Sequence, residues 1–211
     1  MFAGIFIKEK MIREINKRLI TEDKLMCASD MAKVGCQSCE GCGECCKGRG
    51  SSVTLDSWDV GILKKAFDMT FQQLINSGMI SLEPVNDVVL PILGKKEGVD
   101  ECFFIGIDGR CTIHKIRPGI CRLFPLARIY HKDGSFSYFL QEGECPYLDG
   151  SEEKISDWIG LKNIEGYERQ VREYHDRLVV LRKACAETDD EDELVRLKRQ
   201  FLIDNFVKFT V

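Results

Sequence analysis

The segment from Gly35 to Gly50 constrains the fold of this chain more than any other stretch. Its sequence is GCQSCEGCGECCKGRG, in which five cysteines fall within eleven residues and large apolar side chains are absent. Burial of apolar side chains cannot order such a segment, so we expect another interaction, such as metal binding, to hold it in place.

Three features of the whole chain predict a cytoplasmic protein with reduced thiols. The 211 residues include 11 cysteines, an odd number that cannot pair completely within one chain. The first twenty residues lack the basic region of a secretory signal and are typical of an amphipathic helix. The hydrophobic content of 44% suffices for a core without disulfides. Clustered thiols in such a protein more often bind metal than form disulfides.

Charge and hydropathy exclude two classes of partner. The net charge is −4, so no overall basic field favours nucleic acid. No apolar run approaches the roughly 18 residues of a membrane span, and we therefore predict no membrane partner. A protein partner remains open, with the C-terminal helices as a candidate surface.

Eight cysteines are expected to act together as metal ligands: Cys39, Cys42, Cys45, Cys46, Cys102, Cys111, Cys121 and Cys145. The first four form the pattern C-x2-C-x2-C-C. A two-residue spacing lets a tight loop present both sulfurs to one centre, as in zinc and iron–sulfur sites. Adjacent side chains of an extended segment point to opposite sides, so Cys45 and Cys46 favour different centres. We predict two nearby centres or one multinuclear centre.

The remaining cysteines divide into one candidate ligand and two thiols outside the motif. Cys36 continues the two-residue spacing and is open between a ninth ligand, a replacement ligand and a redox-exposed thiol. Cys185 lies on an apolar helical stripe and is expected in the core. Cys27 has no motif partner and is expected to be structural or free.

The segments CEGCGECC and CFFIGIDGRCTIHKIRPGICRLFP resemble the YkgJ-type cysteine-cluster family, also described as a zinc- or iron-chelating domain with the signature CxxCxxCC. The resemblance covers roughly residues 36–148. Phe103 and His114 replace the proline and tyrosine usual in the family, and His114 thereby becomes a candidate extra ligand. Arg117 and Arg122 flank Cys121 in the family motif. The resemblance implies that they offset thiolate charge and orient the loop.

The pattern of ligands leaves the metal open. Zinc and iron–sulfur clusters both accept four cysteine thiolates, and the tandem spacing with its adjacent pair favours an iron–sulfur centre. The leading hypothesis is therefore an iron–sulfur protein with a redox or protein-modification role. A zinc-stabilised structural or interaction module without catalysis is the alternative. A second alternative is an enzyme related to the flagellin lysine-N-methylases, whose similar cluster the resemblance links to iron–sulfur.

Periodicity predicts one α+β domain over residues 1–211, with helices at both ends and short antiparallel strands between them. Residues 27–148 form its metal-binding core, and residues 151–211 form a helical hairpin packed on that core. Helices are expected from Thr54 or Asp56 and from Thr70. Residues 84–93 are β-like, and hairpin turns are expected at 108–109 and 133–134. Helical periodicity returns from about Ile155 with an apolar stripe over 164–185, and a capping box at Thr188 and Glu191 predicts the last helix.

Overall fold

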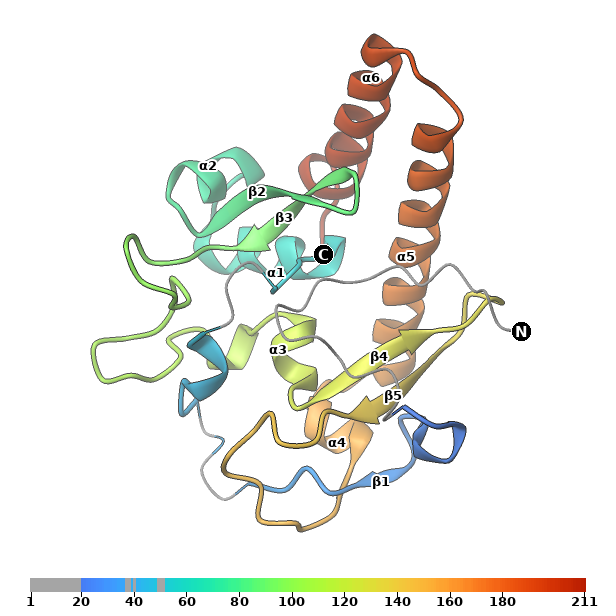
Figure 1. Ribbon diagram of the computed structural model, residues 1–211. Helices are drawn as coiled ribbons and strands as arrows, with labels where there is room; N and C mark the ends of the chain where they lie inside the picture. Colours follow the sequence, from blue (N-terminus) through green and yellow to red (C-terminus); the bar gives the residue numbers. More distant parts are fainter. Residues whose placement is uncertain (1–19, 37–38, 40, 49–51) are drawn as a thin grey trace.

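The computed structural model describes residues 20–36, 39, 41–48 and 52–211 (Figure 1). The expected N-terminal amphipathic helix lies outside these residues. The α-helices are α1 (Ser57–Phe67), α2 (Phe71–Asn76), α3 (Gly119–Leu123), α4 (Ile155–Ile159), α5 (Ile164–Ala186) and α6 (Glu191–Leu202). The 3-10 turns are η2 (Glu22–Lys24), η3 (Glu44–Cys46) and η4 (His114–Ile116), and η5 (Ile203–Val207) is a π-helical turn. The predicted α+β class is confirmed.

Within the described residues, the strands pair into three separate two-stranded antiparallel sheets. They are β1 (Met31–Ala32) with β6 (Glu153–Lys154), β2 (Ile80–Val85) with β3 (Val88–Leu93), and β4 (Leu126–Tyr130) with β5 (Phe136–Leu140). The stretch 84–93 is β-like as predicted, but Asn86 and Asp87 divide it. Both have positive φ, which is the requirement of a tight two-residue hairpin turn.

One of the two predicted hairpins forms a strand ladder. The pair β4–β5 turns through Gly134 as expected. Around Gly109 the described chain instead makes a turn with a single bridge between Ile105 and Cys111. The turn forms as predicted, but the two extended runs do not, because part of the backbone of this stretch bonds to the cysteine loop instead. The amides of Cys102 and Cys111 donate to carbonyl oxygens of the cysteine loop.

Capping residues define the predicted helix starts. Asp56 and Asp59 form a reciprocal capping box at α1, and Thr70 and Gln73 form one at α2. The last helix begins differently from the expectation. Asp190, not Thr188, caps α6, because its carboxylate accepts the amides of both residue 192 and residue 193.

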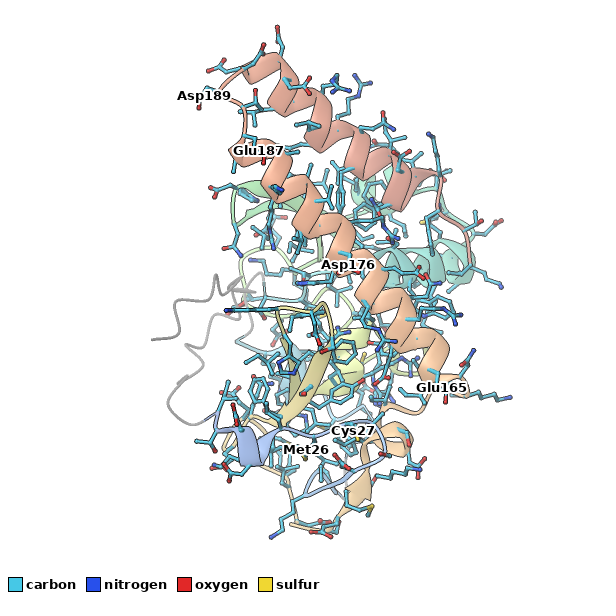
Figure 2. The ribbon with its side chains drawn as sticks, turned by 90° about the vertical axis from the view of Figure 1, so that its right-hand side faces the viewer. Met26, Cys27, Glu165, Asp176, Glu187 and Asp189 are labelled. Carbon is cyan, nitrogen blue, oxygen red and sulfur yellow. The ribbon has the colours of Figure 1, made fainter. Side chains whose placement is uncertain are left out.

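Helix α5 connects two hydrophobic clusters and forms an antiparallel hairpin with α6, as expected (Figures 1 and 2). Its N-terminal half supplies Tyr167 and Val171 to a cluster with β1, β4, β5 and α4. Its C-terminal half supplies Leu178 and Leu181 to a cluster with α1, α2, β2 and β3. Figure 2 shows Glu165 and Glu187 at opposite ends of this helix. None of the described helices is long and apolar enough to cross a membrane.

Helix α3 lies between the two clusters and carries one of the predicted ligands. Cys121 packs against the cluster with α1, α2, β2 and β3, and Leu123, two residues later, belongs to the cluster with β1, β4, β5 and α4. The cysteine site is therefore built where the two parts of the core meet.

Candidate metal centre

Seven of the eight predicted ligands surround one cavity of about 40 Å³: Cys39, Cys42, Cys45, Cys46, Cys102, Cys111 and Cys121. Four of these seven also line a neighbouring cavity of about 20 Å³: Cys45, Cys46, Cys102 and Cys121. The eighth predicted ligand, Cys145, lines neither cavity. Segments separated by as much as 82 positions, from Cys39 to Cys121, thus bring their thiols together in space.

Backbone hydrogen bonds hold the cysteine loop against the later segment. Cys111 N donates to Gly41 O at 3.0 Å, and Cys102 N donates to Cys46 O at 2.8 Å. In Figure 1 the turn η3 accordingly lies beside the connection between β3 and α3. Gly43 has φ 79°, and a β-carbon there would stand 1.9 Å from Gly109 O. Only glycine allows the loop to approach this closely.

Cys46 is the central thiol of the site. It is 8% exposed, and its side chain hydrogen bonds with those of Cys102, Cys111 and Cys45. Cys121 lies within electrostatic reach of Cys45, Cys102 and Cys111. We call these five thiols the inner group: Cys45, Cys46, Cys102, Cys111 and Cys121.

The inner thiols do not share one protonation behaviour. Hydrogen bonding with Cys102 and Cys111 raises the pKa of Cys46, which holds the proton. Hydrogen bonding with Cys46 is the main cause that lowers the pKa of Cys102. Hydrogen bonding with Cys46 is also the main cause that lowers the pKa of Cys111, to about 7. Burial raises the pKa of Cys121 well above its usual value. Even without metal, the inner group therefore stabilises the thiolate form of Cys111.

The adjacent pair differs from the expectation drawn from an extended segment. Cys45 and Cys46 lie in the 3-10 turn η3, where neighbouring side chains do not alternate across a strand. Both residues line both cavities. The premise of an extended backbone is therefore wrong here, and the assignment of Cys45 and Cys46 to different centres stays a prediction.

Cys36 and Cys145 meet beside the inner group. The thiol of Cys145 hydrogen bonds with that of Cys36 and lies within electrostatic reach of Cys42. Cys39 is likewise close to Cys36 and Cys42, and burial is the first cause that raises its pKa to about 11. We call these four thiols the outer group: Cys36, Cys39, Cys42 and Cys145.

The two arginines of the family motif contact the site differently. Arg117 lines the larger cavity, and its charge favours the thiolates of Cys39 and Cys111. Arg117 Nη1 also lies 2.7 Å from Nε2 of His114, so this ring nitrogen accepts a hydrogen bond. His114 lines the cavity, but its Nε2 is engaged by a cation. Arg122 is buried, and its Nη2 donates to Lys115 O at 2.7 Å.

Asp59, one of two neighbouring buried carboxyl groups, contacts the start of helix α3. The sequence did not predict this contact. Asp59 Oδ1 accepts the Gly119 amide at 2.8 Å, two residues before Cys121. Asp59 is 4% exposed. Burial and the neighbouring Asp56 raise its pKa well above the usual value. The D-x-x-D spacing from Asp56 predicts the capping box, but nothing local indicates that Asp59 reaches α3.

The donor set fits a thiophilic metal. Reduced cysteines are numerous here, and soft thiolates select zinc, copper(I) and iron–sulfur centres. Among the side chains that the structure describes, no three histidines, cysteines or carboxylates already stand as a completed metal site. The thiols converge on the cavities without closing on one point, so binding requires side chains to rotate inward.

Reduced cysteines from distant segments thus gather around shared cavities, which defines a thiolate-based metal-binding protein. The profile of the CxxCxxCC family, described as "Putative zinc- or iron-chelating domain", matches residues 38–146. That match covers more than half of the chain, and the protein belongs to this family. No curated protein and no solved structure matches the chain significantly. The family resemblance drawn from the cysteine motifs is confirmed, whereas Cys36 lies outside the matched residues.

The different thiol environments predict selective alkylation in the metal-free, reduced protein. At pH 7 Cys111, with its pKa of about 7, is about half thiolate, whereas Cys39, with its pKa of about 11, is on the order of 10⁻⁴ thiolate. The more basic thiolate is intrinsically more nucleophilic, which offsets part of this difference. We expect Cys111 to react with iodoacetamide roughly 10- to 100-fold faster.

Peptide mapping by mass spectrometry measures both rates in one sample. The ratio should fall as the pH is raised towards 11, because Cys39 then ionises as well. Equal rates at pH 7 would contradict the assigned thiol environments.

Proposed function

We propose that this protein is a zinc-binding module in which four thiolates of the inner group bind one ion. The contact of Cys46 with Cys102 and Cys111 is the observation that carries this proposal. In a tetrahedral site with Zn–S bonds of about 2.3 Å, sulfurs lie roughly 3.8 Å apart. Thiols that already hydrogen bond need little movement to reach that separation.

Zinc bound in this way would tie the cysteine loop to the rest of the fold. The loop between Gly41 and Gly48 has few apolar side chains, and it is held to the later segment by backbone hydrogen bonds. Binding to thiolates from η3, from residues 102–111 and from α3 would join these elements at one point. A site with four protein thiolates has no open coordination position, which supports a structural rather than catalytic role.

An iron–sulfur centre is the second candidate, and a separate observation favours it. Seven thiols surround the larger cavity, more than one zinc ion can bind. The C-x2-C-x2-C spacing of Cys39, Cys42 and Cys45 also occurs in ferredoxins. A redox role belongs to this candidate alone, because zinc has no redox chemistry. A protein-modification role like that of the lysine methylases would further require a substrate cleft beside the cluster.

Metal and sulfide analysis of protein purified without oxygen distinguishes the two candidates. We expect stoichiometric zinc, no acid-labile sulfide and no visible absorption, and we expect chelation to lower the melting temperature. A brown protein with iron and sulfide would replace the zinc proposal by the iron–sulfur candidate. Failure to retain either metal, even after anaerobic reconstitution, would contradict both.

A further inference from the structure

We propose that the four thiols of the outer group form a second metal site, separate from the site of the inner group. The proposal rests on the proposed function, because it assumes that this protein binds metal through thiolates. It adds Cys36, which lies outside the residues matched by the family profile, as a ligand that completes the outer site with Cys145.

Backbone pairing places Cys36 beside the segment that carries Cys145. The sheet β1–β6 pairs Met31–Ala32 with Glu153–Lys154 in antiparallel register. The pairing continues at Gly35, whose amide donates to Ser151 O at 3.0 Å, while its carbonyl oxygen accepts the Asp149 amide at 3.0 Å. Cys36 is the next residue, and its thiol hydrogen bonds with that of Cys145.

Gly35 shows how closely the two segments approach. It is buried, and a β-carbon at this position would stand 1.7 Å from Ser151 Oγ and 2.9 Å from Ser151 O. Glycine is needed here because any side chain would separate the paired backbones. We expect the contact between the thiols of Cys36 and Cys145 to weaken if the two segments are pushed apart.

The turn after Cys36 brings the other two outer thiols to the same place. Cys39 N donates to Cys36 O at 3.4 Å, so these two residues lie close together. Cys42 lies within electrostatic reach of both Cys39 and Cys145. Two-residue spacings from Cys36 to Cys39 and from Cys39 to Cys42 suit ligands of one ion.

The number of thiols agrees with two separate sites. The outer group supplies four thiols, which is the full ligand set of a closed zinc site. The inner group supplies five, and four of them line both cavities. Cys36 and Cys145 line neither cavity, whereas Cys39 and Cys42 line the larger one and so lie between the two groups.

Titration of the metal-free full chain with Co²⁺ tests the proposal, because thiolate-bound Co²⁺ gives charge-transfer and ligand-field absorption. We expect two equivalents for the wild-type protein and one for Cys36→Ser, with the ligand-field bands of the remaining site retained. Cys145→Ser should remove the same equivalent, and the double variant should lose no more. The exposed Cys27→Ser is the matched control and should keep two equivalents.

Two further measurements keep the test decisive if Cys36→Ser folds poorly. Gly35→Ala retains every cysteine but should push Cys36 away from Cys145, so it should weaken binding of the second equivalent at least tenfold and spare the first. In the wild-type protein, the second equivalent of Zn²⁺ should protect all four outer thiols from alkylation together, as mapped by mass spectrometry.

Each outcome separates this proposal from the proposed function. If Cys36→Ser still binds two equivalents, or if zinc never protects Cys36, the outer site is refuted while metal binding by the inner group stands. If the wild-type protein binds no Co²⁺ or Zn²⁺, the proposed function itself fails.

Discussion

Replacement of Cys46 by serine is expected to lower the metal affinity of the inner group by more than about 100-fold. Even groups that only support a metal ligand contribute about 10- to 100-fold to affinity, and Cys46 is a proposed ligand in contact with two others. A serine hydroxyl is a much poorer ligand for a soft metal than a thiolate. The loss should also appear as lower stability, because metal binding is coupled to folding in sites of this kind.

Competition with a chromophoric chelator measures this affinity, and a thermal melt with and without chelator measures the coupled stability. Cys27→Ser is the control, because Cys27 is exposed and its Sγ lies 3.0 Å from Ser29 Oγ (Figure 2). Its affinity should equal that of the wild-type protein. A Cys46→Ser protein that binds metal as tightly as this control would refute the proposed role of Cys46 as a metal ligand.

Replacement of Asp59 by alanine is expected to lower the free energy of unfolding by about 3 kcal/mol, because two buried donors lose their acceptor. These donors are the Gly119 amide at 2.8 Å and the Asp56 amide at 3.3 Å. Thr70→Ala is the matched control, since it breaks the equivalent but solvent-exposed capping box of α2 and should cost about 1 kcal/mol. Urea denaturation of the three proteins measures the difference.

The variant Asp59→Asn separates the hydrogen bonds from the charge. Burial raises the pKa of Asp59 well above the 3.8 of the unfolded chain, so the native state binds the proton more tightly. As the pH rises from below 3.8 to the native pKa, the wild-type protein therefore loses stability that the asparagine variant does not lose. The advantage of aspartate over asparagine should shrink across this interval. An advantage that grows with pH would contradict a buried, protonated Asp59.

Local patterns predicted the elements whose causes lie within a few residues. The helix starts at α1 and α2 follow from short polar capping motifs, and the hairpin β4–β5 follows from Asp133–Gly134 between β-rich segments. The predicted capping residue of α6 was wrong, because two local capping motifs compete at that helix start. At α6, Asp190 caps the helix in place of Thr188, because its carboxylate reaches two free amides.

Prediction also failed where backbone groups bond to a distant part of the chain. The expected strands around Gly109 do not form, because Cys102 and Cys111 donate their amides to the cysteine loop. The adjacent positions of Cys45 and Cys46 predicted that their side chains point to opposite sides, but only if the backbone is extended there. The 3-10 turn η3 instead places both thiols at the same cavities.

The sequence alone identifies the side chains available for metal chemistry and the family to which the chain belongs. The spacing of thiols within a loop is a local property, and it identifies thiolate chelation without knowledge of the fold. Only the tertiary structure decided which thiols meet. Cys46 contacts Cys102 and Cys111, whereas Cys36 contacts Cys145, because backbone pairing joins segments about 55 to 110 residues apart. Such contacts depend on register and close packing between distant segments, and no local pattern records them.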